Sequence, residues 1–586
     1  MTLLAVASRA GTTTGLGAVL NPRGRLRAAA LRAERHLPLA GAAYVETPLE
    51  EALPCARADD LDLYLAHRFL PYRSRSGRLW LVTSDTSIAN RAWLASAYRG
   101  AKLVAAAPVK VQDDIARMFR ERLSDEAVNA LARTMPRFSA SRIAAPEQAR
   151  ALAVAGLLIA LGCVLWPSAA AHILVLVMSL GFATSTAYRV GLALLGRRQR
   201  DDGEAPSGEA DGGLPVYTVL VPLYREANVL PELAEALGAI DYPRDRLDIK
   251  FLVEEDDAET RSAAEALSAE GAFEVLCIPD SLPRTKPKAC NYGLRFARGA
   301  FLVIYDAEDR PERDQLRKAV AKFRQAPPEI ACLQARLAIH NATESWLAHL
   351  FAIDYAIWFK ALLPGLEKLK VPIPLGGTLN HFRTEVLRAA GGWDPFNVTE
   401  DADLGLRLAR FGHRVAMLNS TTYEEAPPRF GPWLRQRSRW LKGYMQTWLV
   451  HMRDPRELVR RVGLRGTLAI QLLLGGAIWS GLVNPVLWLI LAAAHFPVHG
   501  VQATGLENLL AWISGTGLLL ANVLLALLVM TGTRREDRVA LFPHGLGIML
   551  YWVLISLAAY RGLWQLALKP FHWEKTPHGQ AAASGR

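Results

Sequence analysis

The sequence predicts an α/β domain placed between membrane-spanning helices and preceded by a smaller α/β domain. Three observations lead to this prediction. From Val216 onward, short apolar runs alternate with helical patterns, which is typical of a mostly parallel sheet covered by helices. Apolar runs of membrane length lie on both sides of that region. Residues 37–146 carry a shorter mixture of strand-like and helical patterns.

The composition agrees with a chain that has both soluble and membrane parts. Mean hydropathy is +0.12 although 21% of the 586 residues are charged. The formal net charge of +12 comes from arginine-rich stretches beside the apolar runs, which favours contact with membrane lipids over nucleic-acid binding. The five cysteines form no CxxC or Cys/His cluster, so neither structural zinc nor a disulfide framework is indicated.

The amino-terminal third divides into a leader and a small domain. Residues 1–36 are rich in Arg, Ala and Gly, and we expect them to be disordered. The α/β pattern over residues 37–146 distantly resembles the amino-terminal domain of type II secretion ATPases, which in some relatives binds cyclic di-GMP. The chain lacks the repeated Arg-Leu-Gly motif of those relatives. A regulatory partner and a packing module therefore both remain open for this domain.

Two apolar runs then predict a transmembrane hairpin over residues 149–197. Arginines flank it on both sides, which places both of its ends in the cytoplasm of a cell whose inner membrane it spans. Residues 198–213, rich in Gly, Asp, Glu and Pro, form a linker to the predicted catalytic domain at 214–458.

Polar side chains follow the predicted strands, where ligands sit in parallel sheets. The first strand is followed by Pro222, Tyr224 and Glu226, and the second by four acidic residues that include Glu255. Glu255 is our candidate for recognising a nucleoside base. Asp256 and Asp257 either share that role or cap the next helix. Lys288 either supplies positive charge near phosphates or is an ordinary surface lysine.

The next strand, residues 301–305, ends in Asp306, Glu308 and Asp309. Two oxygen ligands one residue apart at a strand end suit a hard divalent cation that also takes diphosphate oxygens. Further along, Thr399-Glu400-Asp401 supplies a carboxylate pair that can deprotonate a hydroxyl.

An amide, a guanidinium and an indole follow at Gln436, Arg439 and Trp440, which can hold a pyrophosphate and stack on a sugar ring. Together with the carboxylate pair and the apolar runs, these residues point to the polymerisation of sugars at a membrane.

Residues 215–455 resemble glycosyltransferase family 2, the inverting GT-A enzymes, and in particular the membrane-bound processive branch of cellulose, curdlan, chitin and mannan synthases. The resemblance rests on motifs in family order, which are Pro222-Leu-Tyr-Arg-Glu226, Asp306-Ala-Glu308, Gly376-Gly-Thr378, Thr399-Glu-Asp401 and Gln436-x-x-Arg439-Trp440. Glu308 replaces the commoner second Asp, and Glu254-Glu255 the usual Asp pair. The carboxylates are kept, so the chemistry is preserved, whereas metal preference and nucleotide fit can shift.

The resemblance implies a nucleotide-diphospho-sugar donor, most simply a UDP-sugar, and Mg²⁺ or Mn²⁺ at Asp306 and Glu308. Asp401 would be the catalytic base, and an α-linked donor would give a β-linked product. The acceptor would lie against Gly376, Gly377, Thr378, Glu400 and Trp440, although the glycines alone are also compatible with a simple turn.

Residues 459–586 predict further membrane helices and a carboxyl-terminal loop. We expect two spans in this region, at residues 468–494 and 508–530, which makes four in the whole chain, and an interfacial helix at 546–568. The segment with Lys575, Thr576 and His578 resembles the Thr-x-Lys gating loop of the processive synthases, which must reach the cytoplasmic active site.

Three functions remain open from the sequence. The favoured one is a processive synthase of a β-linked exopolysaccharide, whose acceptor is the growing polysaccharide. The second is a transferase that adds one sugar to a lipid-linked acceptor. The third is an inactive membrane receptor for a glycan or a second messenger, which the intact carboxylates disfavour.

Overall fold

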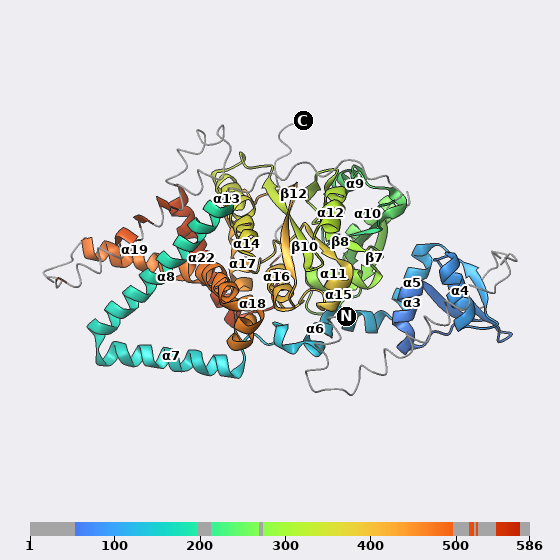
Figure 1. Cartoon of the computed structure of the whole chain (residues 1–586), viewed down its shortest axis with the longest axis horizontal. Coiled ribbons are helices and arrows are strands. Elements are labelled where there is room, and N and C mark those ends of the chain that lie inside the picture. Colours follow the sequence, from blue (N-terminus) through green and yellow to red (C-terminus); the bar gives the residue numbers. More distant parts are fainter. Residues whose placement is uncertain are drawn as a thin grey trace. The chain divides into compact units, whose positions relative to one another are not determined.

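The computed structural model describes residues 53–196, 213–268, 273–495 and 547–574, with a few isolated positions between 505 and 524. The expected leader and most of the expected linker lie outside these residues. The chain forms two compact units, Met1–Leu123 and Ser124–Arg586 (Figure 1).

The smaller unit contains a four-stranded sheet of order β1-β2-β3-β4. The strands β2 and β3 are antiparallel and β3 and β4 are parallel, because α4 connects the last two. Ser87 caps α4, with its side chain accepting a hydrogen bond from the Asn90 amide. The elements are β1 (Leu53–Pro54), α3 (Leu61–His67), β2 (Phe69–Arg73), β3 (Leu79–Thr83), α4 (Ile88–Ala97), β4 (Lys102–Ala105) and α5 (Pro108–Met118). The predicted small α/β region is confirmed.

The larger unit is built on an eight-stranded sheet of order β7-β6-β5-β8-β11-β10-β12-β9. Neighbours from β7 to β8 are parallel, as are β10 and β12, whereas β11 runs antiparallel to both of its neighbours. The strands are β5 (Tyr217–Leu223), β6 (Leu247–Glu254), β7 (Glu274–Ile278), β8 (Phe301–Ile304), β9 (Arg310–Pro311), β10 (Ile330–Ile339), β11 (Asn380–Arg383) and β12 (Arg414–Glu424). The predicted α/β class is confirmed, with a sheet of mixed direction.

Helices cover this sheet and carry the polar residues that the sequence singled out. They are α9 (Leu230–Gly238), α10 (Ala258–Ser268), α11 (Lys286–Phe296), α12 (Gln315–Gln325), α15 (Thr384–Ala389), α16 (Glu400–Arg410) and α17 (Phe430–His451). Two further helices, α13 (Trp346–Ile357) and α14 (Leu363–Leu369), are joined by a π-helix of five residues, Trp358–Leu362. Figure 1 shows α11, α12 and α16 close to the strands.

The larger compact unit begins at Ser124, so it includes residues that the sequence analysis assigned to the small domain. We placed the end of the small domain at residue 146, but α6 (Arg120–Thr134) continues into the larger unit. Asn291 donates to the Ala127 carbonyl at 3.0 Å, and Ser139 donates to the buried Asp394 carboxylate at 3.2 Å. These contacts hold the residues after Leu123 against the catalytic sheet.

Four helices are long and apolar enough to cross a membrane, among the residues that the structure describes. Two of them, α7 (Pro146–Leu165) and α8 (Pro167–Gly196), form the expected hairpin, which is V-shaped in Figure 1. The first of these helices has 20 residues and starts at Pro146, three residues before the predicted hairpin. Another is Pro455–Ile490, which joins α18 (Pro455–Ile470) to α19 (Gly476–His495).

The remaining candidate, Trp346–Leu369, was not expected from the sequence. It connects β10 to β11, which are neighbours in one sheet, so the segment must enter and leave on the same side of any membrane. More than half of its most apolar stretch, 56%, is buried inside the protein. We therefore interpret it as a segment that packs against the sheet strands β10 and β12 and against α8, and that contributes no crossing.

The carboxyl-terminal helix α22 (Gly547–Leu568) is not among the four candidates. It packs against α17, which lies next to the sheet domain, and against α19, which belongs to a candidate membrane span. The expected fourth span, residues 508–530, lies almost entirely outside the described residues.

A buried charge cluster lies in strand β6. Lys250 and Asp248 are both fully buried, 3.0 Å apart, and Lys250 also pairs with Glu274 on β7. Arg298 donates to the Asp248 carboxylate at 2.6 Å, and Thr218 on β5 donates to it at 2.7 Å. Such charges are tolerated in a strand core only when each one is paired.

We predict that Lys250→Met lowers the free energy of unfolding by about 3 kcal/mol, because it removes the fully buried cation that pairs with both Asp248 and Glu274. Thermal unfolding of the full-length protein in detergent measures this loss. The control is Arg261→Ala, which removes an exposed pair with Glu265 and should change stability by less than about 1 kcal/mol. Equal losses in the two variants would contradict the prediction.

Candidate active site

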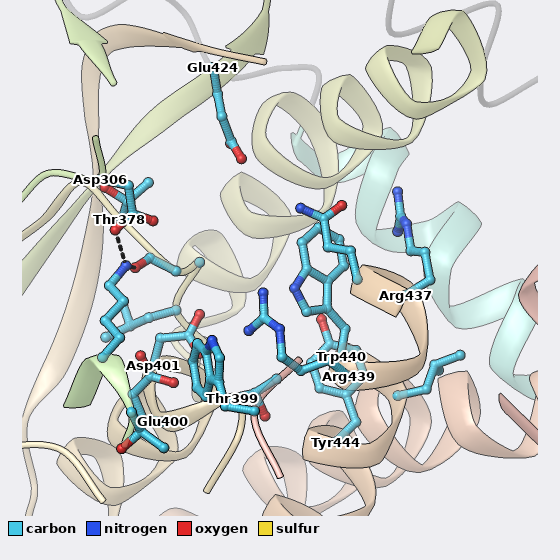
Figure 2. Close-up of a pocket in the computed structure, with 18 of the residues that line it drawn as sticks. Asp306, Thr378, Thr399, Glu400, Asp401, Glu424, Arg437, Arg439, Trp440 and Tyr444 are labelled. Atoms are coloured by element: carbon cyan, nitrogen blue, oxygen red, sulfur yellow. Dashed lines mark hydrogen bonds and ion pairs between the residues drawn. The ribbon is translucent and has the colours of Figure 1, made fainter. Parts of the chain in front are cut away.

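The carboxyl ends of β5, β6 and β8 lie side by side because these strands are parallel neighbours. Beyond them is a cavity of about 900 Å³. The start of α16 and the middle of α17 complete its wall (Figure 2). Polar groups from distant parts of the chain therefore face one space.

Most of the residues predicted from the motifs line this cavity. Asp306, Asp401 and Arg439 reach the same space from three different segments in Figure 2. The predicted residues that line it are Pro222, Tyr224, Glu226, Asp306, Glu308, Gly376, Gly377, Thr378, Glu400, Asp401, Gln436, Arg439 and Trp440. Lys575, Thr576 and His578 lie outside the described residues.

Two predicted donor-binding residues do not line the cavity. Lys288 is buried, and its ammonium pairs with Glu254 at 2.7 Å and donates to the Pro279 and Ser281 carbonyls. The Glu255 carboxylate accepts a hydrogen bond from the Asp280 amide at 3.2 Å. Both side chains support the loop at the cavity's edge, and neither one reaches the space itself.

The lysine of this stretch that faces the cavity is Lys286, two residues before Lys288. Its ammonium forms an ion pair with Asp306 and donates to the Gly377 carbonyl at 2.7 Å. Burial alone would lower the pKa of Lys286, but the carboxylates of Asp306 and Glu400 outweigh it and raise the pKa above its ordinary value. Lys286 therefore stays charged. The sequence analysis missed it, although it lies in the same Lys-Pro-Lys stretch.

The carboxylate pair begins helix α16. Thr399 precedes it in a non-helical conformation, with its amide donating to Asn397 Oδ1 at 3.0 Å. Gly443 of α17 lies so close that an added Cβ would be 2.4 Å from Thr399 Cγ2. The two helices can approach only because this position has no side chain, and that approach brings α17 next to the pair.

Burial raises the pKa of both Glu400 and Asp401. The charge of Asp401 raises the pKa of Glu400 further. Lys286 and Arg439 act in the opposite direction on both carboxyls, because nearby cations favour the ionised forms. The result is a carboxyl at Asp401 that ionises closer to neutral pH than an ordinary aspartate, which suits a general base.

Asp306 and Glu308 offer oxygen ligands to a divalent cation. Behind them, buried Asp309 accepts hydrogen bonds from the Asp306 amide at 2.7 Å and from the Thr378 hydroxyl. Burial and the two neighbouring carboxylates raise the pKa of Asp309 well above its usual range. No cluster of three metal-ligating side chains occurs among the described residues, so two carboxylates fit a cation only if a ligand and water complete its coordination.

One face of α17 supplies Gln436, Arg439 and Trp440, because residues three and four apart share a face. The Oε1 atom of Gln436 is buried and has no hydrogen-bond partner in the described part of the chain. The Arg439 guanidinium stacks on the Trp573 ring at 4.4 Å. Trp440 packs on Tyr355, with ring centroids 5.9 Å apart.

The intervening residue Arg437 also lines the cavity, and its guanidinium contacts α13 and α22. It pairs with Asp354 at 2.7 Å and donates to the Tyr551 hydroxyl of α22 at 2.8 Å. The cavity extends in this direction, since Arg189 of α8, Ala477 of α19 and Tyr551 also line it. The chemistry at the strand ends thus adjoins a partly aromatic space between helices.

The turn after α22 covers part of the cavity. Lys442 donates to the His572 carbonyl at 2.7 Å, and Gln446 donates to the Pro570 carbonyl at 3.2 Å. Glu574 forms a two-pronged ion pair with Arg561 at 2.6 and 2.7 Å. These contacts hold Trp573 over Arg439.

Comparison with known families identifies the region that carries this site. Residues 215–443 match the family described as "Glycosyltransferase like family 2". Among curated proteins, the "Probable glycosyltransferase YdaM" of Bacillus subtilis is 25% identical over 233 residues, which is 39% of this chain and 55% of that protein.

The names of two other relatives indicate different acceptors, a polysaccharide and a lipid. The "Probable glucomannan 4-beta-mannosyltransferase 10" of Arabidopsis thaliana is 26% identical over 249 residues, covering 39% of this chain and 43% of that protein. The "Beta-monoglucosyldiacylglycerol synthase" of Nostoc sp. is 26% identical over 249 residues, covering 41% and 51%. The chain spans about half the length of the curated relatives it matches.

A solved structure with a similar chain trace is the "Mannosyltransferase PcManGT from Pyrobaculum calidifontis in complex with GDP-Man and Mn2+". It is 19% identical, with a TM-score of 0.47, over 68% of this chain and 99% of that one. With the family match and the observed sheet, the predicted GT-A-like fold class is confirmed.

The two glycines of the loop before β11, Gly376 and Gly377, should differ in their tolerance of a methyl group. A Cβ on Gly376 would lie 2.8 Å from Phe359 Cζ, whereas on Gly377 the nearest atom is Asp401 Oδ2 at 3.7 Å. We predict that Gly376→Ala lowers stability by about 1–3 kcal/mol, through overpacking, and that Gly377→Ala is stable. Thermal unfolding of both variants tests this, and a larger loss in Gly377→Ala would contradict it.

Proposed function

We propose that this chain, which carries a family 2 glycosyltransferase domain over residues 215–443, is an inverting membrane enzyme that uses a nucleotide-diphospho-sugar donor. We further propose that it is a processive synthase of a β-linked exopolysaccharide, located in the inner membrane with its catalytic domain in the cytoplasm. One observation carries the proposal, namely that Asp401, Asp306 and Arg439 line one cavity.

In the proposed reaction, Asp401 takes the proton of an acceptor hydroxyl. The hydroxyl oxygen then attacks the anomeric carbon from the face opposite the diphosphate, so the configuration inverts. The raised pKa of Asp401 supports this role, because a base near neutral pH is both ionised and able to hold the proton. Gly377 leaves room beside Asp401 for the acceptor, since a side chain there would face the carboxylate.

The diphosphate leaves as the new bond forms. A divalent cation bound at Asp306 and Glu308 would neutralise its developing charge as a Lewis acid. Arg439 and Gln436 would hydrogen-bond to the same oxygens, and burial strengthens such contacts. Because Trp573 covers the Arg439 guanidinium, the turn after α22 would have to accommodate the donor.

The shape of the cavity favours a long acceptor. It runs from Asp401 past Trp440 to side chains of α8, α19 and α22, and aromatic faces suit sugar rings. The similarity to a glucomannan mannosyltransferase supports a polysaccharide product. The similarity to a glucosyldiacylglycerol synthase supports the second candidate, which is transfer of one sugar to a lipid acceptor next to the same helices.

The first test is product analysis with membranes that contain the full-length protein. UDP-glucose, UDP-N-acetylglucosamine and GDP-mannose are each supplied with Mg²⁺ or Mn²⁺, and labelled products are sized. We expect polymer of high molecular weight with one donor. A single sugar on lipid would select the second candidate, and no transfer from any donor would overturn the enzyme proposal.

The same assay tests the base. We predict that Asp401→Asn lowers the rate by about 10²–10⁴-fold, because the amide cannot accept the proton. The control is Glu265→Gln, an exposed residue on α10 that does not line the cavity, and it should keep the wild-type rate. Activity of Asp401→Asn near that of the control would show that another group acts as the base.

On the acid side of the pH profile, the rate should decline at a higher pH than it would with a base of ordinary aspartate pKa. Burial raises the pKa of Asp401, and only the ionised form accepts a proton, so activity is present above that pKa and lost as the pH falls through it. We expect kcat/KM to decline at a pH clearly above about 4, the usual aspartate value. A rate that stays constant down to pH 4 would contradict the assignment.

A further inference from the structure

Lys286 lies where the backbone disfavours a positive charge, so another group must compensate its charge. It is the first residue of α11, where the helix dipole repels cations and favours anions. Its side chain is only 15% exposed. Lys288 stands in the same turn, but its side chain does not line the cavity and its charge is matched by buried Glu254. The charge of Lys286 is matched inside the cavity, by Asp306.

Lys286 connects the segment after β8 to the loop before β11. Its ion-pair partner Asp306 follows β8, and its hydrogen-bond acceptor Gly377 belongs to the loop before β11. A Cβ on Gly377 would be 3.7 Å from Asp401 Oδ2, so the same loop borders the carboxylate pair. One ammonium therefore ties the candidate metal ligand to the loop beside the candidate base.

Two other cations near the carboxylates, Arg439 and Arg284, have different partners. Arg439 lies under the Trp573 ring, and Arg284 holds Asp280 at 2.7 and 2.8 Å and Asp256 at 3.0 Å. Lys286 is the cation that forms an ion pair with Asp306 in the described part of the chain.

We propose that Lys286 is a positioning residue that holds Asp306 in place until a divalent cation arrives with the donor, and that keeps Gly377 beside Asp401. This inference rests on the proposed function. Lys286 and a divalent cation compete for the Asp306 oxygen, because two positive charges a few ångströms apart repel each other. The lysine thereby weakens metal binding in the absence of the donor and keeps the acceptor loop in register for transfer.

A purely structural lysine would behave differently when it is replaced. Its loss would lower stability and would weaken metal binding or leave it unchanged. A lysine that competes for Asp306 should instead, when removed, let a metal bind more tightly while catalysis becomes slower. Only the competing role thus predicts a higher metal affinity when Lys286 is replaced.

The experiment compares wild type, Lys286→Met and the control Lys318→Met as full-length protein in detergent. Lys318 lies on α12, pairs with Glu312 and Asp314, and does not line the cavity. Binding of Mn²⁺ without nucleotide is measured by electron paramagnetic resonance of the free ion. We expect Lys286→Met to bind Mn²⁺ at least about fivefold more tightly than wild type and the control. Equal or weaker binding would overturn the proposal.

The second readout is the rate of transfer with the donor found in the product assay. We expect kcat of Lys286→Met to fall about 10–100-fold, as for other residues that support metal ligands, with a smaller change in the donor KM. A kcat within twofold of wild type would overturn the positioning role. If wild type itself transfers no sugar, the proposed function fails, whereas an active wild type with an equally active Lys286→Met removes only this inference.

A conservative variant covers the case in which Lys286→Met does not fold. Lys286→Arg keeps the positive charge, but its planar guanidinium cannot reproduce the contacts of a compact ammonium. We expect its Mn²⁺ affinity to stay within about twofold of wild type while kcat falls at least about tenfold. Full activity of Lys286→Arg would show that the geometry of the lysine contact does not matter.

Discussion

Charge compensation in the cavity constrains the structure around it. Glu400 and Asp401 are buried side by side, and two like charges away from water are ionised together only when cations lie near them. The cations come from separate elements, Lys286 from α11 and Arg439 from α17. These helices and α16 must therefore keep fixed positions, which explains why Gly443 leaves no side chain between α17 and Thr399.

The long helix α17 joins this chemistry to the membrane part of the chain. Its residues 436, 439 and 440 face the cavity, while Arg437 reaches Asp354 and Tyr551. A shift of α22 would disturb the Tyr551 contact and, through the turn that follows, the ring of Trp573 over Arg439. The helix α17 thus contacts both the cavity and α22, an arrangement that the proposed function needs where a polymer or lipid acceptor meets a soluble donor.

The fold class could be predicted from local patterns, because strand and helix periodicity depends on neighbours in sequence. Which of the two lysines, Lys286 or Lys288, faces the cavity could not be predicted from such patterns. Lys286 and Lys288 are two positions apart on a helix, so their side chains point to different sides, and only the packing of α11 determines which side faces the cavity. Glu255 was chosen for its place after a strand, but the loop at Asp280 takes up its carboxylate.

The sequence by itself determined the order of the elements, the apolar helices and the chemical groups available for catalysis, because these follow from residue type and spacing. The tertiary structure decided which groups meet. In the structure, β11 runs antiparallel to its neighbours and residues 124–146 belong to the larger unit. Lys286 contacts both Asp306 and Gly377. The reason is physical, since contacts between residues far apart in the chain depend on how buried surfaces and charges are matched in three dimensions.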